Sequence, residues 1–419
     1  MTRREAPELV VEPSALFPPL SGVGYYTREL LRAYEALPGH FPVRILGSRW
    51  YFKPWQGPAD IHLRRVSEAT GYAIDLQMKL TPSALDERLR RRHRRLPFPV
   101  DLFTEPGSRV FFYPNYVGPP LGQSPSVPVI YDFSYLRYPH ILKARSVDYL
   151  RRYLPATIRQ ATRVVVISES IKAELIRFFG VPADKIDVVY PAIDLTAFRP
   201  DIPWAVREYV RRKHGLGGDY IFSLSTVEPR KNFPRLIQAY ALLPAGVRAV
   251  YPLVVAGGKG WKNDDVFATI KRLGLEAQVQ FLGYIDEEDR APLMSEAALF
   301  VLPSLYEGFG MPVLEAMACG APVVTSSRGA LAEVGGEAVV DVDPHEPEDI
   351  ARGMLSVLTD AALERKLARA GPVRAQAFTW ESSARVLAET FARAAAEGGP
   401  KKSVYVRFAQ AVFPSKSKP

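Results

Sequence analysis

The sequence predicts an α/β protein with two doubly wound, parallel-sheet domains of the Rossmann-like type. Short apolar segments alternate with helix-length amphipathic segments in both halves of the 419-residue chain. Strands that are apolar along their whole length and are separated by helices are typical of parallel sheets buried on both faces. Prolines interrupt both periodicities near residues 190–206, which indicates a joint between two such runs.

Six apolar segments of the first half are predicted to be strands. They are residues 8–12, 42–48, 109–114, 127–132, 163–168 and 186–191. The segments 24–37 and 169–180 have the apolar spacing of helices. This half is predicted to form a domain at residues 1–198, with an irregular, basic insertion at about 50–108.

The second half repeats the pattern. Its predicted strands are residues 219–226, 251–258, 279–284, 298–304, 321–327 and 337–342. They are predicted to form a second domain at residues 199–385. We expect residues 386–419 to be a C-terminal helix and a basic tail that cross back to the first domain.

Composition narrows the class of protein. A single cysteine, Cys319, excludes an internal disulfide framework, and no histidines stand at metal-ligand spacing. The N-terminus lacks the apolar core of a signal peptide, and no segment approaches the roughly 18 apolar residues that a spanning helix needs. We therefore expect a cytoplasmic protein without structural zinc.

The net charge of +9 is concentrated in the first half, at residues 88–97 and 143–163. Such a surface attracts anions, but it is equally typical of a solvated helical face. The sequence has no recognisable nucleic-acid-binding module, so nucleic acid is not expected as a partner. We expect peripheral contact with an anionic membrane, through the arginines at 90, 91, 92, 94 and 95 and the tail at 401–419.

The segment YEGFGMPVLEAMACGAPV, residues 306–323, is predicted to be the loop and helix that follow a buried strand. Pro312 suits the first turn of a helix, and Gly320 with Pro322 ends it before the next strand. Ligands of open parallel sheets lie outside the carboxyl ends of strands, where free amides at a helix start bind anions.

Two carboxylates flank this helix start. Glu307 lies beside Gly308 and Gly310, where the backbone can approach a ligand closely, and Glu315 lies about one turn inside the helix. An ionised carboxylate accepts several hydrogen bonds, so it suits a vicinal pair of hydroxyls. The segment therefore predicts a site for a ligand with hydroxyls at both ends and phosphates between, such as a nucleotide sugar.

Other strand ends of the second half carry residues of the same kind. Arg230 and Lys231 stand at the mouth of a helix, where they would face a diphosphate. Gly257 and Gly258 follow the next strand, and Gly283 and Tyr284 follow the one after.

These motifs resemble those of the retaining glycosyltransferase family 4, which has the GT-B fold of two domains facing each other across a cleft. The E-x7-E spacing of Glu307 and Glu315 and the EPRKN block at 228–232 carry the resemblance, which extends from about 215 to 380. In the first half, SGVGYYTREL resembles the family's glycine-rich loop, VIYDFSYLRYPH its acceptor-side loop, and residues 164–194 the segment before the hinge.

The pattern is also similar to that of bacterial mannosyltransferase-like enzymes that build surface polysaccharides. The resemblance implies transfer of a hexose, most simply mannose from GDP-mannose, to an oligosaccharide or polyprenyl-diphosphate-linked glycan. A UDP-sugar donor is the alternative within the family. Outside it, a sugar-nucleotide epimerase or a noncatalytic sugar-nucleotide-binding protein stays open.

The resemblance also implies roles for individual residues. Glu307 would hold hydroxyls of the transferred sugar, Glu315 the ribose, and Arg230 and Lys231 the diphosphate. Gly22 and Gly24 would let the first loop close over the donor. The implied catalytic set is Glu307, Arg230, Lys231 and Asp132. The implied donor-binding set is Gly22, Gly24, Gly257, Tyr284, Gly308, Phe309, Gly310, Met311 and Glu315.

Two positions depart from the family pattern. Tyr131 replaces a histidine that is common before the aspartate at 132, so no histidine role carries over. Thr226 replaces a basic residue, which leaves more of the diphosphate contact to Arg230. Fixed cations and helix-end amides can stabilise a leaving diphosphate, so we expect no metal and no cofactor.

Structural roles compete with these functional ones. Glu228 is interpreted as bonding backbone amides of its turn, and Asp132 could equally cap a helix or turn. Tyr284 could pack between the domains, and Cys319 suits a small buried side chain. Neither Glu307 nor Lys231 is expected in the core.

Overall fold

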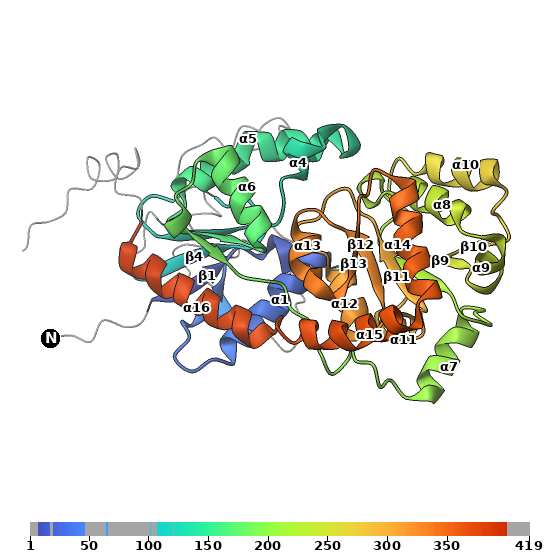
Figure 1. Ribbon diagram of the computed structural model, residues 1–419. Coiled ribbons are helices and arrows are strands. Elements are labelled where there is room, and N and C mark those ends of the chain that lie inside the picture. Colours follow the sequence, from blue (N-terminus) through green and yellow to red (C-terminus); the bar gives the residue numbers. More distant parts are fainter. Residues whose placement is uncertain are drawn as a thin grey trace, which may run out of the picture.

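The computed structural model describes residues 7–16, 20–46, 64–65, 101, 107–119 and 121–399. Most of the predicted insertion, the arginine cluster at 88–97 and the tail at 401–419 lie outside these residues. The described chain forms two domains side by side, each a parallel sheet with helices on both faces (Figure 1).

The N-terminal sheet has the strand order β3-β2-β1-β4-β5-β6-β7, and every neighbouring pair is parallel. Its strands are β1 (Glu8–Val11), β2 (Val43–Ile45), β3 (Arg64–Arg65), β4 (Arg109–Tyr113), β5 (Ser126–Ile130), β6 (Val164–Val166) and β7 (Ile186–Val188). All six strands predicted for this half are confirmed. The two-residue β3 is too short to leave an apolar pattern in the sequence.

The C-terminal sheet has the order β10-β9-β8-β11-β12-β13, and it too is wholly parallel. Its strands are β8 (Ile221–Leu224), β9 (Leu253–Ala256), β10 (Val279–Gly283), β11 (Leu299–Leu302), β12 (Val323–Ser326) and β13 (Val340–Val342). All six predicted strands are again present. The order of connection reverses between β8 and β11, and such switch points are where doubly wound sheets bind ligands.

The helices alternate with the strands. In the N-terminal domain they are α1 (Gly22–Glu35), α4 (Ser134–Arg137), α5 (Ala144–Gln160) and α6 (Glu169–Phe179), with the 3-10 turns η1 (Pro13–Leu16), η3 (Pro139–Ile141) and η4 (Ala183–Lys185). The next set runs from α7 (Trp204–Lys213) through η5 (Pro229–Lys231), α8 (Phe233–Leu242), α9 (Ala245–Val250), α10 (Asp264–Leu273) and α11 (Glu287–Ser295). The last set comprises α12 (Met311–Ala318), α13 (Ala330–Gly335), η6 (Gly336–Ala338), α14 (Pro347–Thr359), α15 (Ala361–Ala375) and α16 (Trp380–Glu397).

Local sequence signals set the helix ends. Ser168 caps α6 by accepting a hydrogen bond from the Ile171 N–H at 3.2 Å, and Gly180 ends that helix in the left-handed conformation with a φ of 63°. Gly274 ends α10 in the same way. Within the described chain, no helix is long and apolar enough to span a bilayer.

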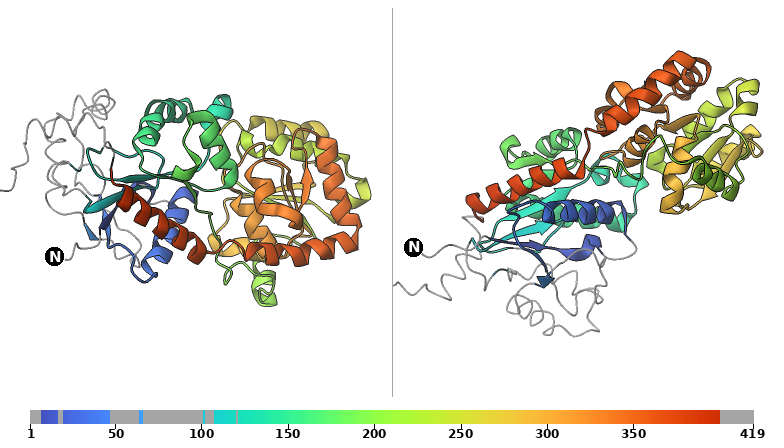
Figure 2. Two further views of the ribbon diagram at one scale, coloured as in Figure 1. Left: turned by 60° about the vertical axis from the view of Figure 1, so that its left-hand side comes forward. Right: turned by 90° about the horizontal axis from the view of Figure 1, so that it is seen from below.

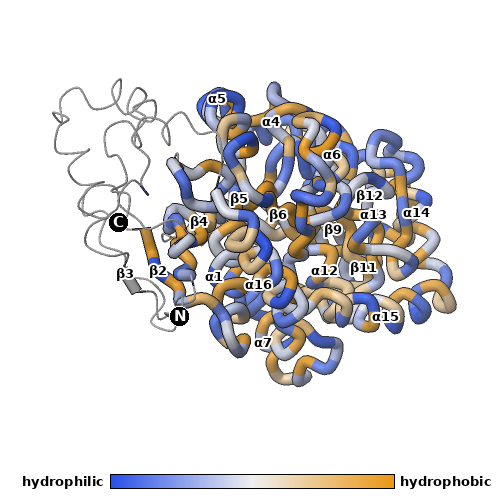
Figure 3. Tube along the Cα trace, turned by 90° about the vertical axis from the view of Figure 1, so that its left-hand side faces the viewer, coloured by the Kyte–Doolittle hydropathy of each residue, from blue (hydrophilic) through white to orange (hydrophobic). Residues whose placement is uncertain are grey.

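The buried residues of each domain are concentrated in the strands of its sheet. Strands β8, β9, β11 and β12 are buried along their whole length, as parallel strands covered on both faces must be. Strands and outer helices differ in hydropathy in the N-terminal domain. In Figure 3, β2 is mainly hydrophobic and the outer helix α5 is largely hydrophilic. The strand ends are therefore the places where polar residues can gather without disturbing either core.

Helix α16 returns to the N-terminal domain after the C-terminal sheet is complete. It packs against α1 and the strands β4, β5 and β7, and all views place it along the N-terminal sheet (Figures 1 and 2). Phe391 is fully buried there, with its ring edge-on to Tyr34 at 5.4 Å and to Phe112 at 5.2 Å. The last helix that the structure describes thus completes the core of the first domain.

Replacing Phe391 by alanine is expected to destabilise the N-terminal domain by about 3–5 kcal/mol, because the change empties a buried aromatic site that three elements share. Chemical denaturation followed by hydrogen exchange of β4 and β5 would measure this loss. Phe267→Ala is the matched control, since that ring is 45% exposed on α10. Equal losses in the two variants would contradict the packing role of α16.

Candidate active site

The predicted cationic residues lie beside the switch point of the C-terminal sheet. Arg230 and Lys231 form the turn η5 after β8, and Glu307 lies on the loop after the neighbouring strand β11. Asn232 fixes this turn in a left-handed conformation with a φ of 65°. Its side-chain amide donates to the carbonyl oxygens of Pro303 and Pro344, at 3.0 and 2.6 Å, so one side chain joins the turn to the loops after β11 and β13.

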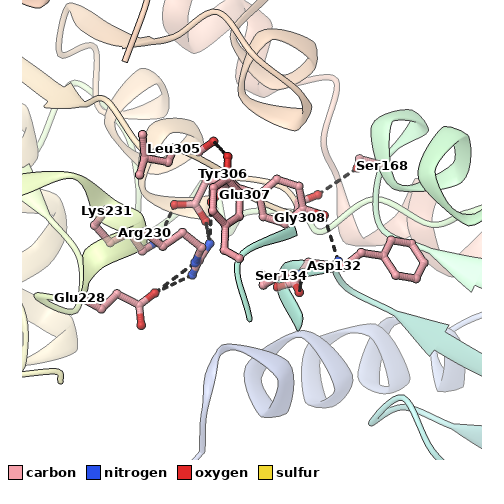
Figure 4. Close-up of polar contacts among 12 residues, drawn as sticks. Asp132, Ser134, Ser168, Glu228, Arg230, Lys231, Leu305, Tyr306, Glu307 and Gly308 are labelled. Atoms are coloured by element: carbon pink, nitrogen blue, oxygen red, sulfur yellow. Dashed lines mark hydrogen bonds and ion pairs between the residues drawn. The ribbon is translucent and has the colours of Figure 1, made fainter. Parts of the chain in front are cut away.

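Glu307 is shared by the two cations. One carboxylate oxygen accepts from Arg230 Nη1 and the other from Lys231 Nζ, each at 2.6 Å. Arg230 also donates to Glu228, with its Nη2 2.9 Å from Oε1, so its guanidinium lies between two carboxylates (Figure 4). We call Glu228, Arg230, Lys231 and Glu307 the charge cluster.

The charge cluster corrects two expectations. Glu307 and Lys231 are only 7% and 8% exposed, so both belong to the buried part of the domain and not to its surface. Glu228 accepts from the Arg230 side chain and not from amides of its turn, and its side chain makes no cap hydrogen bond. The reason is the same in both cases, since buried charges need partners of opposite sign.

Burial and charge act together on these groups. Burial alone would raise the pKa of Glu307, but Arg230 and Lys231 outweigh it and lower that pKa to about 2. Burial lowers the pKa of Lys231, although Glu307 opposes the shift. The pKa of Arg230 is raised, because Glu307, Asp132 and Glu228 together outweigh its burial. The carboxylate is thus fixed in its ionised form.

The loop of Glu307 touches the N-terminal domain. A Cβ on Gly308 would lie 2.1 Å from the carbonyl oxygen of Tyr131, so only glycine fits between the domains here. The Gly308 carbonyl accepts from Ser168 Oγ at 2.9 Å, which ties it to the start of α6. The charge cluster therefore lies at the domain boundary.

Asp132 approaches the cluster from the N-terminal domain. It follows β5, and its Oδ1 accepts from the Ser134 N–H at 2.9 Å, so it caps the turn that begins α4. Asp132 also raises the pKa of Arg230 across the boundary (Figure 4). The capping role that the sequence left open for Asp132 is present.

Helix α12 begins beside Glu307. Gly310 has a φ of 109°, Met311 is the first helical residue, and Pro312 lies in the first turn as predicted. The Phe309 ring is buried against Tyr190 and Phe378, so its side chain belongs to the core. Pro312 has no N–H, and the N–H groups of Val313 and Leu314 donate to the Gly310 carbonyl, so only the Met311 N–H of this turn lacks an acceptor within the helix.

Glu315 lies inside α12 with its side chain 4% exposed. Arg290 of α11 donates to its Oε2, and its guanidinium also lies over the Phe198 ring at 5.7 Å. Burial raises the pKa of Glu315, and Arg290 counteracts part of that shift. Sequence reasoning missed Arg290, because nothing in the acidic segment around it indicates a partner 25 residues away.

The remaining predicted donor residues are spread along neighbouring loops. Gly22 and Gly24 lie in the first turn of α1, where Ser21 accepts from the Gly24 N–H at 3.4 Å. Gly257 follows β9, and its N–H donates to the Gly283 carbonyl at 2.7 Å. Tyr284 is 80% exposed, which excludes the expected alternative of packing between the domains.

The departures from the family pattern have structural consequences. Tyr131 is buried, donates to the Pro114 carbonyl at 2.7 Å, and packs edge-on against Tyr26, so its hydroxyl points into the N-terminal domain. Thr226 is exposed after β8. Cys319 is buried as expected, and burial raises the pKa of its thiol.

Sequence reasoning also missed Tyr306 and Glu174, whose side chains form a hydrogen bond between the domains beside the charge cluster. Tyr306 stood in the quoted motif, but a tyrosine before a glutamate carries no signal of its own. Among the described residues, no three or more histidine, cysteine, aspartate or glutamate side chains are grouped as metal ligands.

Acid is expected to destabilise the protein as the pH falls from about 5 to 2, partly through Glu307. Folding lowers the pKa of this group from its ordinary 4.5, so its contribution is present above that value and is lost toward pH 2. Glu307→Gln removes this titrating group. Between pH 5 and pH 2 the unfolding free energy of this variant should therefore fall by up to about 3 kcal/mol less than that of the unmodified protein. The exposed residue 276 supplies the control, Glu276→Gln, whose acid limb should match the unmodified protein. A Glu307→Gln limb as steep as that of the control would refute this assignment.

Comparison with known proteins identifies the family. The model of "Glycosyltransferase Family 4" matches residues 20–197, and that of "Glycosyl transferases group 1" matches residues 206–374. O-antigen chain mannosyltransferase B of Escherichia coli is 34% identical over 257 residues, which are 61% of this chain and 67% of the relative. The serotype-specific mannosyltransferase WbdA of Escherichia coli is 33% identical over 240 residues, or 57% of this chain but only 29% of that relative.

A solved structure shows the same fold. Sucrose-phosphate synthase of Thermosynechococcus elongatus superposes with a TM-score of 0.66 at 20% sequence identity, over 91% of this chain and 98% of that chain. Together with the two family models, this agreement covers both domains and the sheet edges that carry the site. The chain belongs to glycosyltransferase family 4 and has the GT-B fold.

Proposed function

We propose that the protein is a retaining hexosyltransferase that moves mannose from GDP-mannose to a lipid-linked or oligosaccharide acceptor in surface polysaccharide synthesis. The observation that carries the proposal is the charge cluster, in which two largely buried cations stand at the switch point and face the N-terminal domain. Similarity to mannosyltransferases of O-antigen synthesis supports mannose as the sugar and a surface glycan as the product.

In this proposal Arg230 and Lys231 bind the diphosphate. Negative charge develops on the diphosphate as the sugar bond breaks, and fixed cations in a poorly hydrated place stabilise that charge strongly. The Arg230 side chain is 17% exposed and the Lys231 side chain 10%, so both are largely shielded from water but not sealed from the boundary. The N-terminal end of α12, with the Met311 N–H, adds partial positive charge beside them.

Glu307 and Glu315 bind hydroxyls in the same proposal. Glu307, held ionised, accepts hydrogen bonds from the transferred sugar, and Glu315 accepts them from the ribose. Asp132 faces the acceptor from the N-terminal side. Retention requires the acceptor to attack on the face that the diphosphate leaves, with a phosphate oxygen taking the acceptor proton.

Membrane contact also belongs to the proposal, since a lipid-linked acceptor lies at a membrane surface. Its support is the arginine cluster of the sequence, at positions outside the described residues. Sedimentation with anionic and with neutral liposomes is the test of that contact.

We expect the protein to turn over GDP-mannose, and to turn over UDP-glucose much more slowly. Lys231→Ala and Glu307→Gln should each lower transfer by about 100-fold or more, because each removes a group that stabilises the leaving diphosphate or orients the sugar. Release of nucleotide diphosphate, with and without added glycan acceptor, would measure this.

Lys271→Ala is the matched control, since that lysine is exposed on α10 away from the charge cluster. Melting temperatures should be recorded for all variants, because Lys231 and Glu307 are buried and their loss also affects folding. Folded variants with undiminished turnover would rule out the site, and preference for UDP-glucose would replace the proposed donor.

Activity is expected to persist in EDTA, because side chains and amides supply the positive charge that a divalent cation would otherwise bring to the diphosphate. Initial rates with EDTA should equal those with added Mg²⁺ or Mn²⁺ within about two-fold. A strict requirement for either ion would contradict the metal-independent mechanism.

A further inference from the structure

The Tyr306 hydroxyl joins the two domains next to the charge cluster. It donates to Glu174 Oε2 of α6 at 2.5 Å and accepts from the Phe133 N–H at 2.9 Å. Phe133 directly follows Asp132, and Tyr306 directly precedes Glu307. One hydroxyl therefore connects the backbone beside the acceptor-side aspartate to the backbone beside the sugar-side glutamate (Figure 4).

The residue is anchored at its other end as well. Its carbonyl oxygen accepts from Arg230 Nη1 at 2.9 Å, the same nitrogen that binds Glu307. Tyr306 thus has its backbone fixed to the charge cluster and its side chain fixed to the N-terminal domain. A shift of one domain against the other must move this residue or break one of its bonds.

Glu174, which accepts the hydrogen bond from the Tyr306 hydroxyl, is itself held in place by Arg137. It is 8% exposed, and its second oxygen accepts from Arg137 Nε at 2.8 Å and from Nη2 at 2.6 Å. Arg137 is the last residue of α4, which begins two residues after Asp132. The carboxylate therefore holds both Tyr306 and the far end of the acceptor-side turn.

The Tyr306 hydroxyl has fixed donor and acceptor roles in these hydrogen bonds. Burial, together with the negative charges of Asp132 and Glu174, raises the pKa of the Tyr306 phenol. The phenol consequently keeps its proton at any working pH. It remains a donor to Glu174 and an acceptor for the Phe133 N–H.

Building on the proposed function, we propose that Tyr306 is a positioning residue that aligns the acceptor side, at Asp132, with the donor side, at Glu307 and Arg230. This alignment should affect glycan transfer and donor hydrolysis to different extents. Transfer to a glycan needs both sides in register, whereas hydrolysis of the donor needs only the donor side and water. Tyr306 should therefore favour transfer over hydrolysis more than it favours donor binding.

Tyr306→Phe tests this, because it keeps the ring and removes the hydroxyl. Glycan transfer is expected to fall by about 10-fold or more, since small misalignments of reacting groups cost large factors in rate. Donor hydrolysis without acceptor and the KM for the donor should change less than about three-fold. Glu174→Gln should lower the ratio of transfer to hydrolysis in the same direction, and the double variant should lower it little further.

Tyr220→Phe is the matched control, since its buried hydroxyl donates to the Leu293 carbonyl at 2.8 Å, within the C-terminal domain. Its ratio of transfer to hydrolysis should stay at the unmodified value. An equal fall in the control, or an unchanged ratio in Tyr306→Phe, would overturn the positioning role. Failure of the unmodified protein to turn over any donor would instead overturn the proposed function, so the two failures are distinguishable.

Discussion

The sharing of the Glu307 carboxylate by Arg230 and Lys231 is the interaction on which the site depends. Two neighbouring cations in a poorly hydrated place repel each other, and burial disfavours the charge of each. A carboxylate 2.6 Å from both offsets these costs, and Glu228 supplies a second negative charge to Arg230. Loss of one partner from a buried pair typically costs about 3–5 kcal/mol, so the cluster is held as a unit.

The same loop that carries this carboxylate also makes the domain boundary. Gly308 follows Glu307 and lies against the Tyr131 carbonyl so closely that no side chain fits. The loop cannot therefore be adjusted to suit the charge cluster without disturbing the contact between the domains. This coupling explains why polar residues that follow β5 or lie on α6, such as Asp132 and Glu174, come close to the charge cluster although they bind none of its cations directly.

The sequence predicts the sheets well because the information is local. A buried parallel strand leaves a continuous apolar segment, and β8 and β11 are recognisable from four residues each. Glycine, proline and charged residues at the strand ends are local signals too, so the sequence predicts that Arg230, Lys231 and Glu307 follow strands and that Pro312 begins a helix. β3 has only two residues and leaves no comparable pattern.

Contacts between distant segments could not be predicted in this way. Glu174 and Tyr306 are 132 residues apart, and the pairing of Arg290 with Glu315 depends on how α11 packs beside α12. A hydrophobic period indicates which face of a helix is buried, but it does not indicate which polar group of another element will meet it. The burial of Lys231 was missed for the same reason, since its partner comes from another strand end.

The start of α6 shows how firmly the domains are joined. Two of its free amides, those of Glu169 and Ser170, donate to the Glu333 carboxylate of α13 at 2.9 and 3.1 Å, and Tyr190 donates to the same group. A helix of the N-terminal domain is thus capped by a residue of the other domain. Separation of the domains would return these amides to water at a cost of about 1 kcal/mol for a lost cap. Ser168 and Glu174 add hydrogen bonds to Gly308 and Tyr306, so the segment of α6 is joined to the C-terminal domain at three places.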